Sequence, residues 1–503
     1  MEQDKYKKLQ NGSDVRGIAI TNGSEIQNLT PQIVKNISAA FTDYISSKYG
    51  LPCDVIKIGV GHDSRLSAKE LKAGVIEGVQ GMDSICMDCG LVSTPSMFMS
   101  TILEASAFHG AIMITASHLP FNRNGLKFFT KDGGLESKDI KVILEMAASL
   151  EEKQLKSNSP SVQTFDLIHY YSEHIMNMIK TEVQAEDYEH PLKGLHIVVD
   201  AGNGACGFFA KEILEPLGAD TTGSVFLEPD GSFPNHIPNP ENPQAMDAIQ
   251  KATLSSKADL GVIFDCDGDR AAVVLSDGQE VNRNALIALM AAIVSEQYPG
   301  TTVVTDSVTS DYLTEFLEKE LHMKHLRLKR GYKNVINESI RLNSIGEESH
   351  LAIETSGHGA LKENYFSDDG AYMSVKIICK MAKLRKENKT LQSLTAALKY
   401  PKESKEYRLT IQTEDFKAYG NQVLQDFMAF AKEQPTFHIV KDNYEGIRVS
   451  FDDEEVSGWI LIRMSLHDPI IPINVEANRE GGVQVILNRV RPFLDAYEKL
   501  SKL

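Results

Sequence analysis

The sequence predicts an α/β protein of several domains. Strand-like apolar runs such as VIKIGVG (55–61), GLHIVVDAG (194–202) and TTVVTD (301–306) alternate with amphipathic helical stretches through most of the chain, which is typical of α/β layering. The chain has 503 residues, which is too many for one ordinary hydrophobic core. We therefore expect three or four domains.

The predicted elements fall into successive strand–helix units, and the first helix begins near Ala68. The other strand-like runs are SICMDCG (84–90), GAIMITAS (110–117), ADLGVIFDCDGDR (258–270), HLRLK (325–329) and LAIETSGH (351–358). The apolar ALIALMAAIV (285–294) predicts a buried helix. Lysine-rich stretches at 383–392 and 399–407 predict a linker into a final unit, which holds GIRVSF, GWILIRMS and INVEA and ends in a helix after Gly482.

Composition and charge exclude several classes of protein. A net charge of -17 argues against a nucleic-acid-binding surface, although it is compatible with small phosphorylated metabolites. The polar start MEQDKYKKLQNGSD has no apolar core of a secretory signal, and no apolar run is long enough to span a membrane. Six cysteines in a chain of this length predict incidental or structural thiols, the Cys86–Cys89 pair included. We expect a cytoplasmic protein.

The strongest chemical signal is the run Asp265-Cys266-Asp267-Gly268-Asp269-Arg270, which follows the apolar LGVIF. In extended backbone, alternate residues point the same way, so three carboxylates are expected to converge and to require a cation. A small cluster of oxygen ligands suits Mg²⁺. An acidic surface turn is the simpler alternative.

A second signal is Thr115-Ala116-Ser117-His118, at the end of a strand-like run, where α/β folds present ligands. His118 and Lys127 are candidates for proton transfer or for charge neutralisation near Ser117. A serine–histidine pair is weak on its own, and no G-x-S-x-G surrounds it, which counts against a serine hydrolase.

Two further polar clusters also follow apolar runs. In Glu354-Thr355-Ser356-Gly357-His358, Glu354 and Ser356 are candidates for hydrogen bonds to sugar hydroxyls, and His358 is a candidate acid or base. An ordinary loop is equally compatible with this cluster. The second cluster offers the guanidinium, hydroxyl and glycine-rich backbone that a phosphate dianion requires; its candidate residues are Arg463, Ser465, His467 and Arg479.

One motif points to a different function. Gly202-Asn203-Gly204-Ala205-Cys206-Gly207 fits G-x-G-x-x-G between a strand and a helix, and Asp220 lies close to the spacing of a ribose contact. Taken alone, it predicts an NAD-binding oxidoreductase. A tight strand-to-helix turn uses glycine equally well.

Taken in order, these clusters resemble the α-D-phosphohexomutase family, which includes phosphoglucomutases and phosphomannomutases. The resemblance covers nearly the whole chain, through the motifs GSDVRG (12–17), GHDSR (61–65), TASHLP, VVDAGNG, DCDGDR, ETSGH and the closing RMSLHDP and INVEA. It implies three related α/β domains with mixed sheets and a smaller C-terminal α+β domain. The expected domains are 1–165 with a phosphoserine loop, 166–285 with a metal-binding loop, 286–400 with a sugar-binding loop, and 401–503 with a phosphate-binding loop.

The resemblance also implies a role for each cluster. Ser117 would be the phosphoserine, and one of its phosphate oxygens would join three carboxylates around Mg²⁺, those of Asp265, Asp267 and Asp269. Lys127 matches the general acid or base, and Arg16 and Arg270 match cleft arginines. The sugar loop would comprise Glu354, Ser356 and His358, and a further cation would come from Lys329 or Lys333. The implied partners are hexose phosphates and hexose 1,6-bisphosphates, with a monomer or dimer and neither nucleic acid nor membrane.

The sequence departs from the family in the last of these loops. Members usually close with Arg-x-Ser-Asn-Thr, whereas Leu466 and His467 follow Ser465 here. Each lost hydrogen bond to a charged group costs about 1.5–3 kcal/mol unless it is replaced. We expect a specialised member that releases glucose 1,6-bisphosphate and recharges its serine from a donor such as fructose 1,6-bisphosphate. The alternative is an ordinary phosphoglucomutase or phosphomannomutase.

Overall fold

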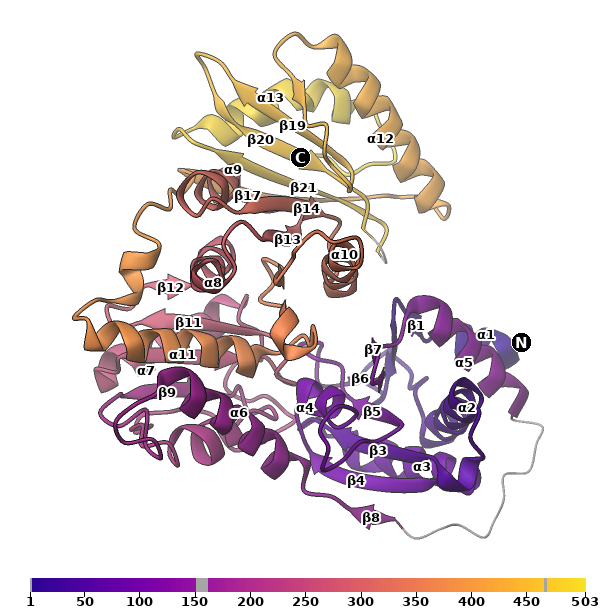
Figure 1. The fold of residues 1–503 in the computed structure, drawn as a ribbon. Helices are drawn as coiled ribbons and strands as arrows, with labels where there is room; N and C mark the ends of the chain where they lie inside the picture. The colour runs from indigo at the N-terminus through magenta and orange to yellow at the C-terminus, as the bar shows by residue number, and fades with distance from the viewer. Residues whose placement is uncertain (1, 151–161, 466–467) are drawn as a thin grey trace. The chain divides into compact units, whose positions relative to one another are not determined.

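The computed structural model forms two compact units, which are described separately (Figure 1). The first unit comprises Met1–Ile293 and Ser356–Ser393, and the second comprises Val294–Thr355 and Leu394–Leu503. The structure describes residues 2–150, 162–465 and 468–503.

The first unit begins with a mixed eight-stranded sheet in the order β1-β2-β6-β5-β3-β4-β8, with β7 beside β6. Its central strand β5 has all five residues buried, which explains why it is continuously apolar. β5 pairs in parallel with β3 and antiparallel with β6. The strands are β1 (Gln10–Asn11), β2 (Asp14–Ile18), β3 (Lys57–His62), β4 (Ile85–Leu91), β5 (Gly110–Ile114), β6 (Arg123–Thr130), β7 (Gly133–Gly134) and β8 (Gln163–Thr164).

Helices α2, α3 and α5 share one hydrophobic core with this sheet. α2 is well bounded: Thr30 accepts a hydrogen bond from the Ile33 N–H at its start, and Gly50 ends it in the left-handed conformation with φ 64°. The helices of this part of the chain are α1 (Glu2–Lys7), α2 (Pro31–Tyr49), η1 (Cys53–Val55), α3 (Ala68–Gly81), α4 (Thr94–Met99), α5 (Ser137–Leu150) and α6 (Leu167–Val183).

The second sheet of the first unit has the order β12-β11-β10-β9, in which β9 and β10 are parallel and the other pairs antiparallel. Helix α7 covers one face through Met246 and Ile249. The remaining elements of the first unit are β9 (Ile197–Asp200), η2 (Phe209–Leu214), α7 (Pro243–Ser256), β10 (Leu260–Phe264), β11 (Ala271–Leu275), β12 (Glu280–Val281), β16 (Gly359–Leu361), η4 (Lys362–Asn364) and α11 (Gly370–Lys386), of which β16 is not a strand of this sheet. Helices α8 (Asn284–Gln297) and η5 (Leu391–Leu394) cross into the second unit.

The second unit holds two sheets. In one, β13 pairs in parallel with both β14 and β15. The other is an antiparallel sheet in the order β17-β21-β20-β19-β18, with α12 and α13 packed against it. The elements are β13 (Thr302–Asp306), α9 (Asp311–Glu315), η3 (Phe316–Glu320), β14 (Lys324–Leu328), α10 (Tyr332–Ser344), β15 (Leu351–Ile353), β17 (Glu403–Thr410), α12 (Phe416–Glu433), β18 (His438–Ile439), β19 (Ile447–Asp452), β20 (Ser457–Ile462), β21 (Ile470–Ala477) and α13 (Gly482–Asp495).

These sheets confirm the predicted fold class, while the four domain boundaries stay a prediction.

The predicted linker is wrong at both ends. Lys383 to Lys386 form the last turn of α11, and Glu403 begins β17. Lysine side chains misled the prediction because their aliphatic stems can line a helix or an edge strand while the ammonium groups stay in water. In the described part of the chain, no helix has the length and apolar character that a membrane span requires.

Helices α2 and α3 approach so closely that a methyl group would not fit between them. A Cβ on Gly78 would lie 2.1 Å from the Lys35 carbonyl oxygen, which belongs to the backbone of α2 and cannot swing away. The exposed Ala73, one turn earlier on α3, faces no such neighbour. The two positions therefore separate helix propensity from packing.

We expect Gly78→Ala to destabilise the protein by about 1–3 kcal/mol, because overpacking outweighs the better helix propensity of alanine. Ala73→Gly should cost about 1 kcal/mol from propensity alone. Thermal unfolding followed by circular dichroism measures both changes. A Gly78→Ala protein that melts above the wild type would contradict the close approach of the two helices.

Candidate active site

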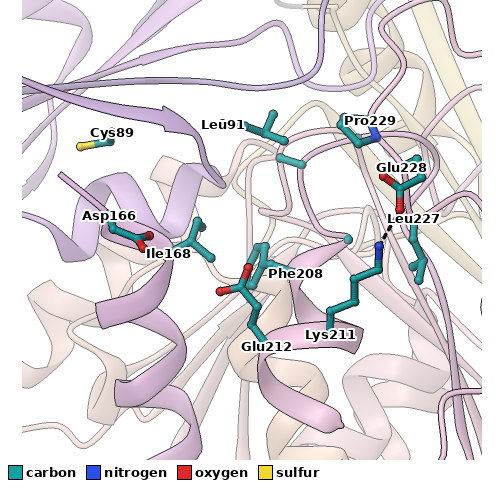
Figure 2. Close-up of a pocket in the computed structure, with 13 residues that line it drawn as sticks. Cys89, Leu91, Asp166, Ile168, Phe208, Lys211, Glu212, Leu227, Glu228 and Pro229 are labelled. Atoms are coloured by element: carbon teal, nitrogen blue, oxygen red, sulfur yellow. Dashed lines mark hydrogen bonds and ion pairs between the residues drawn. The ribbon is translucent and has the colours of Figure 1, made fainter. Parts of the chain in front are cut away.

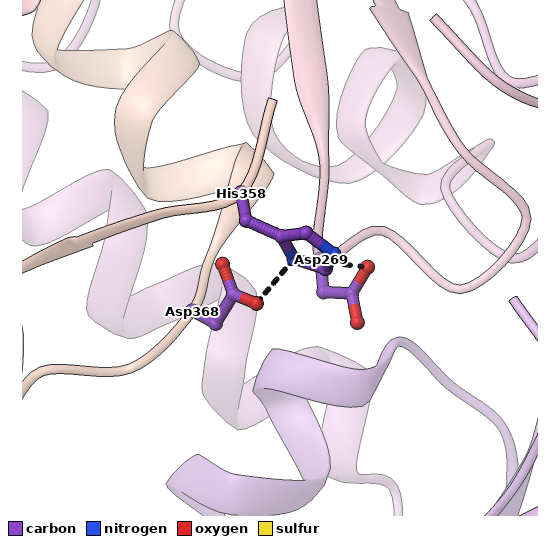
Figure 3. Close-up of side chains that lie close together, drawn as sticks. All are labelled: Asp269, His358 and Asp368. Carbon is purple, nitrogen blue, oxygen red and sulfur yellow. Dashed lines mark hydrogen bonds and ion pairs between the residues drawn. The ribbon is translucent and has the colours of Figure 1, made fainter. Parts of the chain in front are cut away.

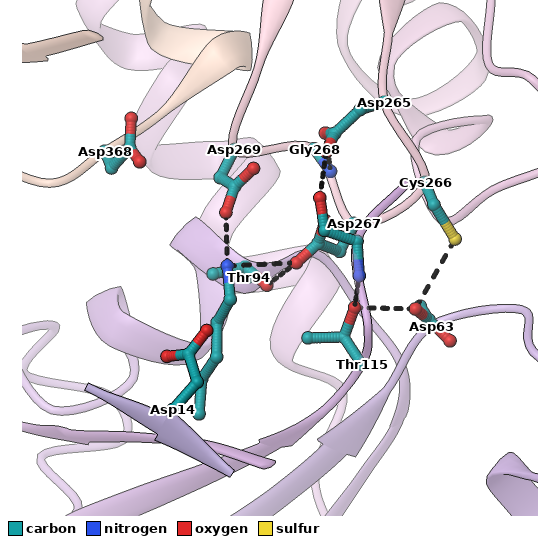
Figure 4. Close-up of polar contacts among 12 residues, drawn as sticks. Asp14, Asp63, Thr94, Thr115, Asp265, Cys266, Asp267, Gly268, Asp269 and Asp368 are labelled. Atoms are coloured by element: carbon teal, nitrogen blue, oxygen red, sulfur yellow. Dashed lines mark hydrogen bonds and ion pairs between the residues drawn. The ribbon is translucent and has the colours of Figure 1, made fainter. Parts of the chain in front are cut away.

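The ends of two strands meet in the first unit (Figure 4). Ser117 follows β5, and Asp265 follows β10. The Ser117 Oγ–H donates to Asp265 Oδ2 over 2.7 Å, and both side chains are buried. Two residues that are 148 positions apart are thus brought into direct contact. A nucleophilic hydroxyl and a carboxylate cluster therefore share one place.

Asp265, Asp267 and Asp269 converge as predicted, but not for the predicted reason. Their ligand atoms lie within 4.8 Å of one another, and all three side chains are buried. The loop is a turn rather than an extended strand, with Gly268 at a φ of 77°. Only glycine adopts this conformation without strain, and a Cβ there would also lie 2.3 Å from Cys206 Sγ. The turn, not strand alternation, gathers the carboxylates.

The pKa values of the carboxyl groups in this cluster shift in different directions. Burial and the neighbouring Asp269 and Asp267 raise the pKa of Asp265 well above its ordinary value. Burial would also raise the pKa of Asp269, but Lys127, His358 and Arg270 together outweigh burial and lower that pKa. The Lys127 ammonium donates to Asp269 Oδ2 and lies 3.4 Å from Asp267 Oδ2. One lysine therefore neutralises only part of the buried charge.

The carboxylate cluster fits a divalent cation. Among the described residues, Asp267 Oδ1 and Asp269 Oδ1 are buried without a hydrogen-bond partner. A buried, unpaired carboxylate oxygen is costly, and a cation would satisfy it. Carboxylate oxygens are the ligands that Mg²⁺ takes from proteins. Thr94, at the start of α4, holds the other oxygen of Asp267 over 2.6 Å and so orients this ligand.

Ser117 adopts the left-handed backbone conformation, with a φ of 49°. This conformation is uncommon for residues other than glycine, and strained backbone of this kind is enriched at functional sites. His118 Nδ1 lies 3.3 Å from Ser117 Oγ. The positive charge of Arg270, burial, and Arg16 lower the pKa of His118 to about 2. His118 is therefore a neutral hydrogen-bonding partner and a poor proton acceptor.

His358 lies between Asp368 and Asp269 (Figure 3). Its Nδ1 contacts Asp368 Oδ2, and the Arg270 Nε–H donates to its Nε2 over 2.8 Å. A guanidinium only donates, so this contact requires a neutral ring with its proton on Nδ1. Burial opposes a charge on His358, as does the nearby Arg270, but Asp368 and Asp269 together outweigh both and raise the pKa of His358. Both ring nitrogens of His358 are thus engaged by neighbouring side chains.

The remaining predicted residues of the first unit lie as follows. Arg16, on β2, donates to the Thr115 carbonyl oxygen over 2.5 Å and to Asp14 over 2.7 Å. It thereby contacts the backbone of the serine loop directly. Ser356 is buried two residues before His358, in the segment that leads to β16.

In the second unit, Glu354 Oε1 accepts the backbone N–H of Gly331 over 2.6 Å. Segment 329–333 holds both predicted cations. Lys329 is exposed and Lys333 is half-buried. Sequence reasoning missed Arg330, which lies between them and contacts Asp306 at 3.8 Å. No local pattern in the sequence distinguishes Arg330 from its lysine neighbours.

Arg463 is buried in the second unit, and its Nη1 lies 3.7 Å from Glu445 Oε1. Glu445 also accepts hydrogen bonds from the Ser307 hydroxyl and from the Arg330 N–H. The Glu445 carboxylate thus occupies hydrogen-bond donors that a bound phosphate would otherwise use. The backbone N–H of Ser465 donates to the carbonyl of Ile470.

The other two predicted phosphate-binding residues are Arg479 and His467. Arg479 is exposed and donates to the Glu454 carbonyl. His467, together with Leu466, lies outside the described residues.

The glycines of the G-x-G-x-x-G turn pack closely against neighbouring backbone. A Cβ on Gly204 would lie 2.5 Å from the Cys266 carbonyl oxygen, and one on Gly207 would lie 2.2 Å from that of Leu227. These glycines let the protein's own backbone approach, which supports the tight-turn interpretation. A pocket of about 310 Å³ adjoins the turn (Figure 2). Its charged side chains suit no pyrophosphate, because three are acidic and one is basic: Asp166, Glu212, Glu228 and Lys211.

Several residues of the site gave no separate signal in the sequence. Asp63 and Arg65 belong to the GHDSR motif, which indicated the family but no role. Thr94 follows the β4 strand, and Asp368 lies in a Ser-Asp-Asp-Gly run that resembles an ordinary turn. Their importance comes from contacts across long stretches of sequence, which no local pattern records.

Comparisons with known proteins agree with this arrangement. Three models of the phosphoglucomutase/phosphomannomutase family, for its alpha/beta/alpha domains I, II and III, match residues 7–154, 169–278 and 282–400. A phosphoglucomutase from Neisseria gonorrhoeae is 27% identical over 88% of this chain and 89% of its own. A phosphomannomutase/phosphoglucomutase from Pseudomonas aeruginosa PAO1 is 28% identical over 89% of each chain.

A solved structure resembles the whole chain. It is a phosphoglucomutase/phosphomannomutase family protein from Burkholderia thailandensis, with a TM-score of 0.77 and 25% sequence identity, and the match covers 99% of this chain and 98% of the other. Together, the matched domains, the buried carboxylate cluster and the serine beside it lead to one conclusion. The chain belongs to the phosphoglucomutase/phosphomannomutase family and is a phosphotransferase of the phosphohexomutase type.

Proposed function

We propose that this enzyme interconverts hexose 1-phosphates and hexose 6-phosphates, with Ser117 as the phosphoryl carrier. The observation that carries the proposal is the contact between Ser117 Oγ and Asp265 Oδ2, 2.7 Å apart in a buried cluster of three aspartates. The relatives named above are phosphoglucomutases or phosphomannomutase/phosphoglucomutases, which favours hexose monophosphates as substrates.

The proposed reaction moves one phosphoryl group in each direction. The hydroxyl oxygen of a bound hexose phosphate attacks the phosphorus on Ser117, the bond between phosphorus and Oγ breaks, and a hexose 1,6-bisphosphate forms. The hydroxyl proton leaves for a base, and Oγ regains a proton. The bisphosphate then returns its other phosphate to Ser117, which leaves the isomeric monophosphate.

The proposed roles follow from charge and position. Asp265, Asp267 and Asp269 would hold Mg²⁺, which when bound supplies positive charge at the phosphoryl oxygens. Lys127, which contacts Asp267 and Asp269, would donate a proton and neutralise charge. His358 suits proton transfer better than His118, because its pKa is raised while that of His118 is lowered. Glu354, Ser356 and Arg16 would bind the sugar phosphate, with Lys329 or Lys333.

A second candidate is synthesis and release of glucose 1,6-bisphosphate. The observation that favours it is the replacement of two hydrogen-bonding residues by Leu466 and His467 in the segment after Arg463 and Ser465. A weaker hold on the second phosphate would let the bisphosphate leave before it turns over. The names of the relatives support the mutase over this synthase.

Cation binding tests the metal role apart from catalysis. We expect Asp267→Asn to weaken Mn²⁺ binding, measured by calorimetric titration, at least about tenfold, because a buried ligand is lost. Asp247→Asn, on the exposed face of α7, should bind Mn²⁺ as the wild type does. Equal affinity of Asp267→Asn and wild type would rule out the proposed site.

A product assay separates the two candidate functions. With Mg²⁺, glucose 1-phosphate and a trace of glucose 1,6-bisphosphate, we expect rapid formation of glucose 6-phosphate. Ser117→Ala should lose this activity by several orders of magnitude, since it removes the nucleophile. Ser149→Ala, at an exposed position of α5, is the matched control. Accumulation of glucose 1,6-bisphosphate from a fructose 1,6-bisphosphate donor, without interconversion, would favour the synthase.

A further inference from the structure

A buried arginine clamps the backbone of the serine loop. The Arg65 side chain is fully enclosed. Its Nη1 donates to the carbonyl oxygens of Pro120 and Arg123, over 2.8 and 3.0 Å. Its Nη2 donates to those of Ser117 and Leu119. A single guanidinium therefore binds four carbonyl groups of one loop.

Asp63 fixes this arginine and links it to the carboxylate loop. Asp63 Oδ2 lies 3.3 Å from Arg65 Nε, and Oδ1 accepts the Arg65 backbone N–H over 3.0 Å. Oδ2 also accepts the Thr115 hydroxyl over 2.7 Å and contacts Cys266 Sγ at 3.4 Å (Figure 4). Cys266 lies between Asp265 and Asp267. One buried carboxylate thus joins the serine loop to the loop with the three aspartates.

The same network holds both backbone polar groups of Ser117. The Ser117 N–H donates to Thr115 Oγ1 over 2.9 Å, and its carbonyl accepts from Arg65. Between these two contacts Ser117 has a φ of 49°, which is unfavourable for a residue with a side chain. Such a conformation persists only where its surroundings fix it. The fixed backbone directs Oγ toward Asp265.

Only arginine can make this set of contacts. Its planar fork donates to four carbonyl groups here, and its Nε forms an ion pair with Asp63 at 3.3 Å without a hydrogen bond. A lysine ammonium has three donors at one point and cannot span the loop. The side chain is also too deeply buried to serve as a substrate-binding cation, and its guanidinium lies 5.4 Å from the centre of the Phe233 ring.

We infer that Arg65, Asp63 and Thr115 are positioning residues for the phosphoryl carrier, because they hold Ser117 in the strained conformation that points its Oγ at Asp265. This inference rests on the proposed function, in which Ser117 carries the phosphate. The three residues touch neither the reacting oxygen nor the ligand atoms of the aspartates. They set the distance between the serine loop and the carboxylate loop through Asp63.

Thr115 offers the cleanest variants, because valine replaces its hydroxyl with a methyl group of similar size, whereas serine keeps the hydroxyl. Thr115→Val keeps the shape but removes the acceptor of the Ser117 N–H and the donor to Asp63. Thr115→Ser keeps both. Arg65→Lys removes the four-carbonyl clamp. Val79→Ala, in the core at the far end of α3, gives a loss of stability without a change in the loop.

Two measurements on the full-length protein test the inference. The first is amide hydrogen exchange of residues 115–123, which should speed up in Thr115→Val and Arg65→Lys but not in Thr115→Ser or Val79→Ala. The second is steady-state kinetics with glucose 1-phosphate. We expect kcat to fall roughly 10- to 100-fold in Thr115→Val and in Arg65→Lys, with KM nearly unchanged, because the nucleophile is misplaced while substrate binding is intact.

The outcomes separate the clamp from the proposed function. Unchanged exchange of 115–123 in both variants would overturn the clamp, whatever the kinetics show. Faster exchange with a normal kcat would also overturn it, since the loop would then be held for stability alone. A wild type that does not interconvert hexose phosphates would instead overturn the proposed function, and the exchange data would still decide whether the clamp exists.

Discussion

The structure depends on the burial of three carboxylates beside one hydroxyl. Negative charges in a low-dielectric interior repel strongly, and each needs a partner. Lys127 supplies one positive charge by direct contact, and Arg270 approaches Asp265 and Asp269 at 3.9 and 4.0 Å. Two carboxylate oxygens still lack a hydrogen bond within the described chain, and a divalent cation is the group that would satisfy them. The same deficit of positive charge makes the cluster suited to a cation, and phosphoryl transfer needs a cation at the phosphoryl oxygens.

The α/β architecture brings these groups together. β3 and β5 are parallel neighbours, so their carboxyl ends place Asp63 beside Thr115 at one edge of the sheet. β10 belongs to the second sheet of the same unit, and the turn that gathers the aspartates follows its last residue. The site therefore draws on strand ends, where short loops can carry polar groups without interrupting a core. Gly268 and Gly204 allow this turn to pack tightly against its neighbours.

Much of this could be predicted from the sequence. Continuous apolar runs such as GAIMI predicted buried strands, and the carboxylates and Ser117 stood at strand ends. The turn of the aspartate loop was not predicted, since alternate aspartates fit a strand equally well. The contacts of Asp63 and Arg65 were not predictable either, because their partners lie more than 50 residues away. Lysine-rich segments predict a linker by composition alone, because composition does not show whether an aliphatic stem packs on a helix.

The most direct test of the account is to locate the phosphate on the protein. The enzyme would be incubated with Mg²⁺ and glucose 1,6-bisphosphate, digested, and its peptides analysed by mass spectrometry. The account predicts one phosphate on Ser117, removed when glucose 1-phosphate is added and absent from Ser117→Ala. Phosphate on another residue, or label that glucose 1-phosphate does not discharge, would contradict it.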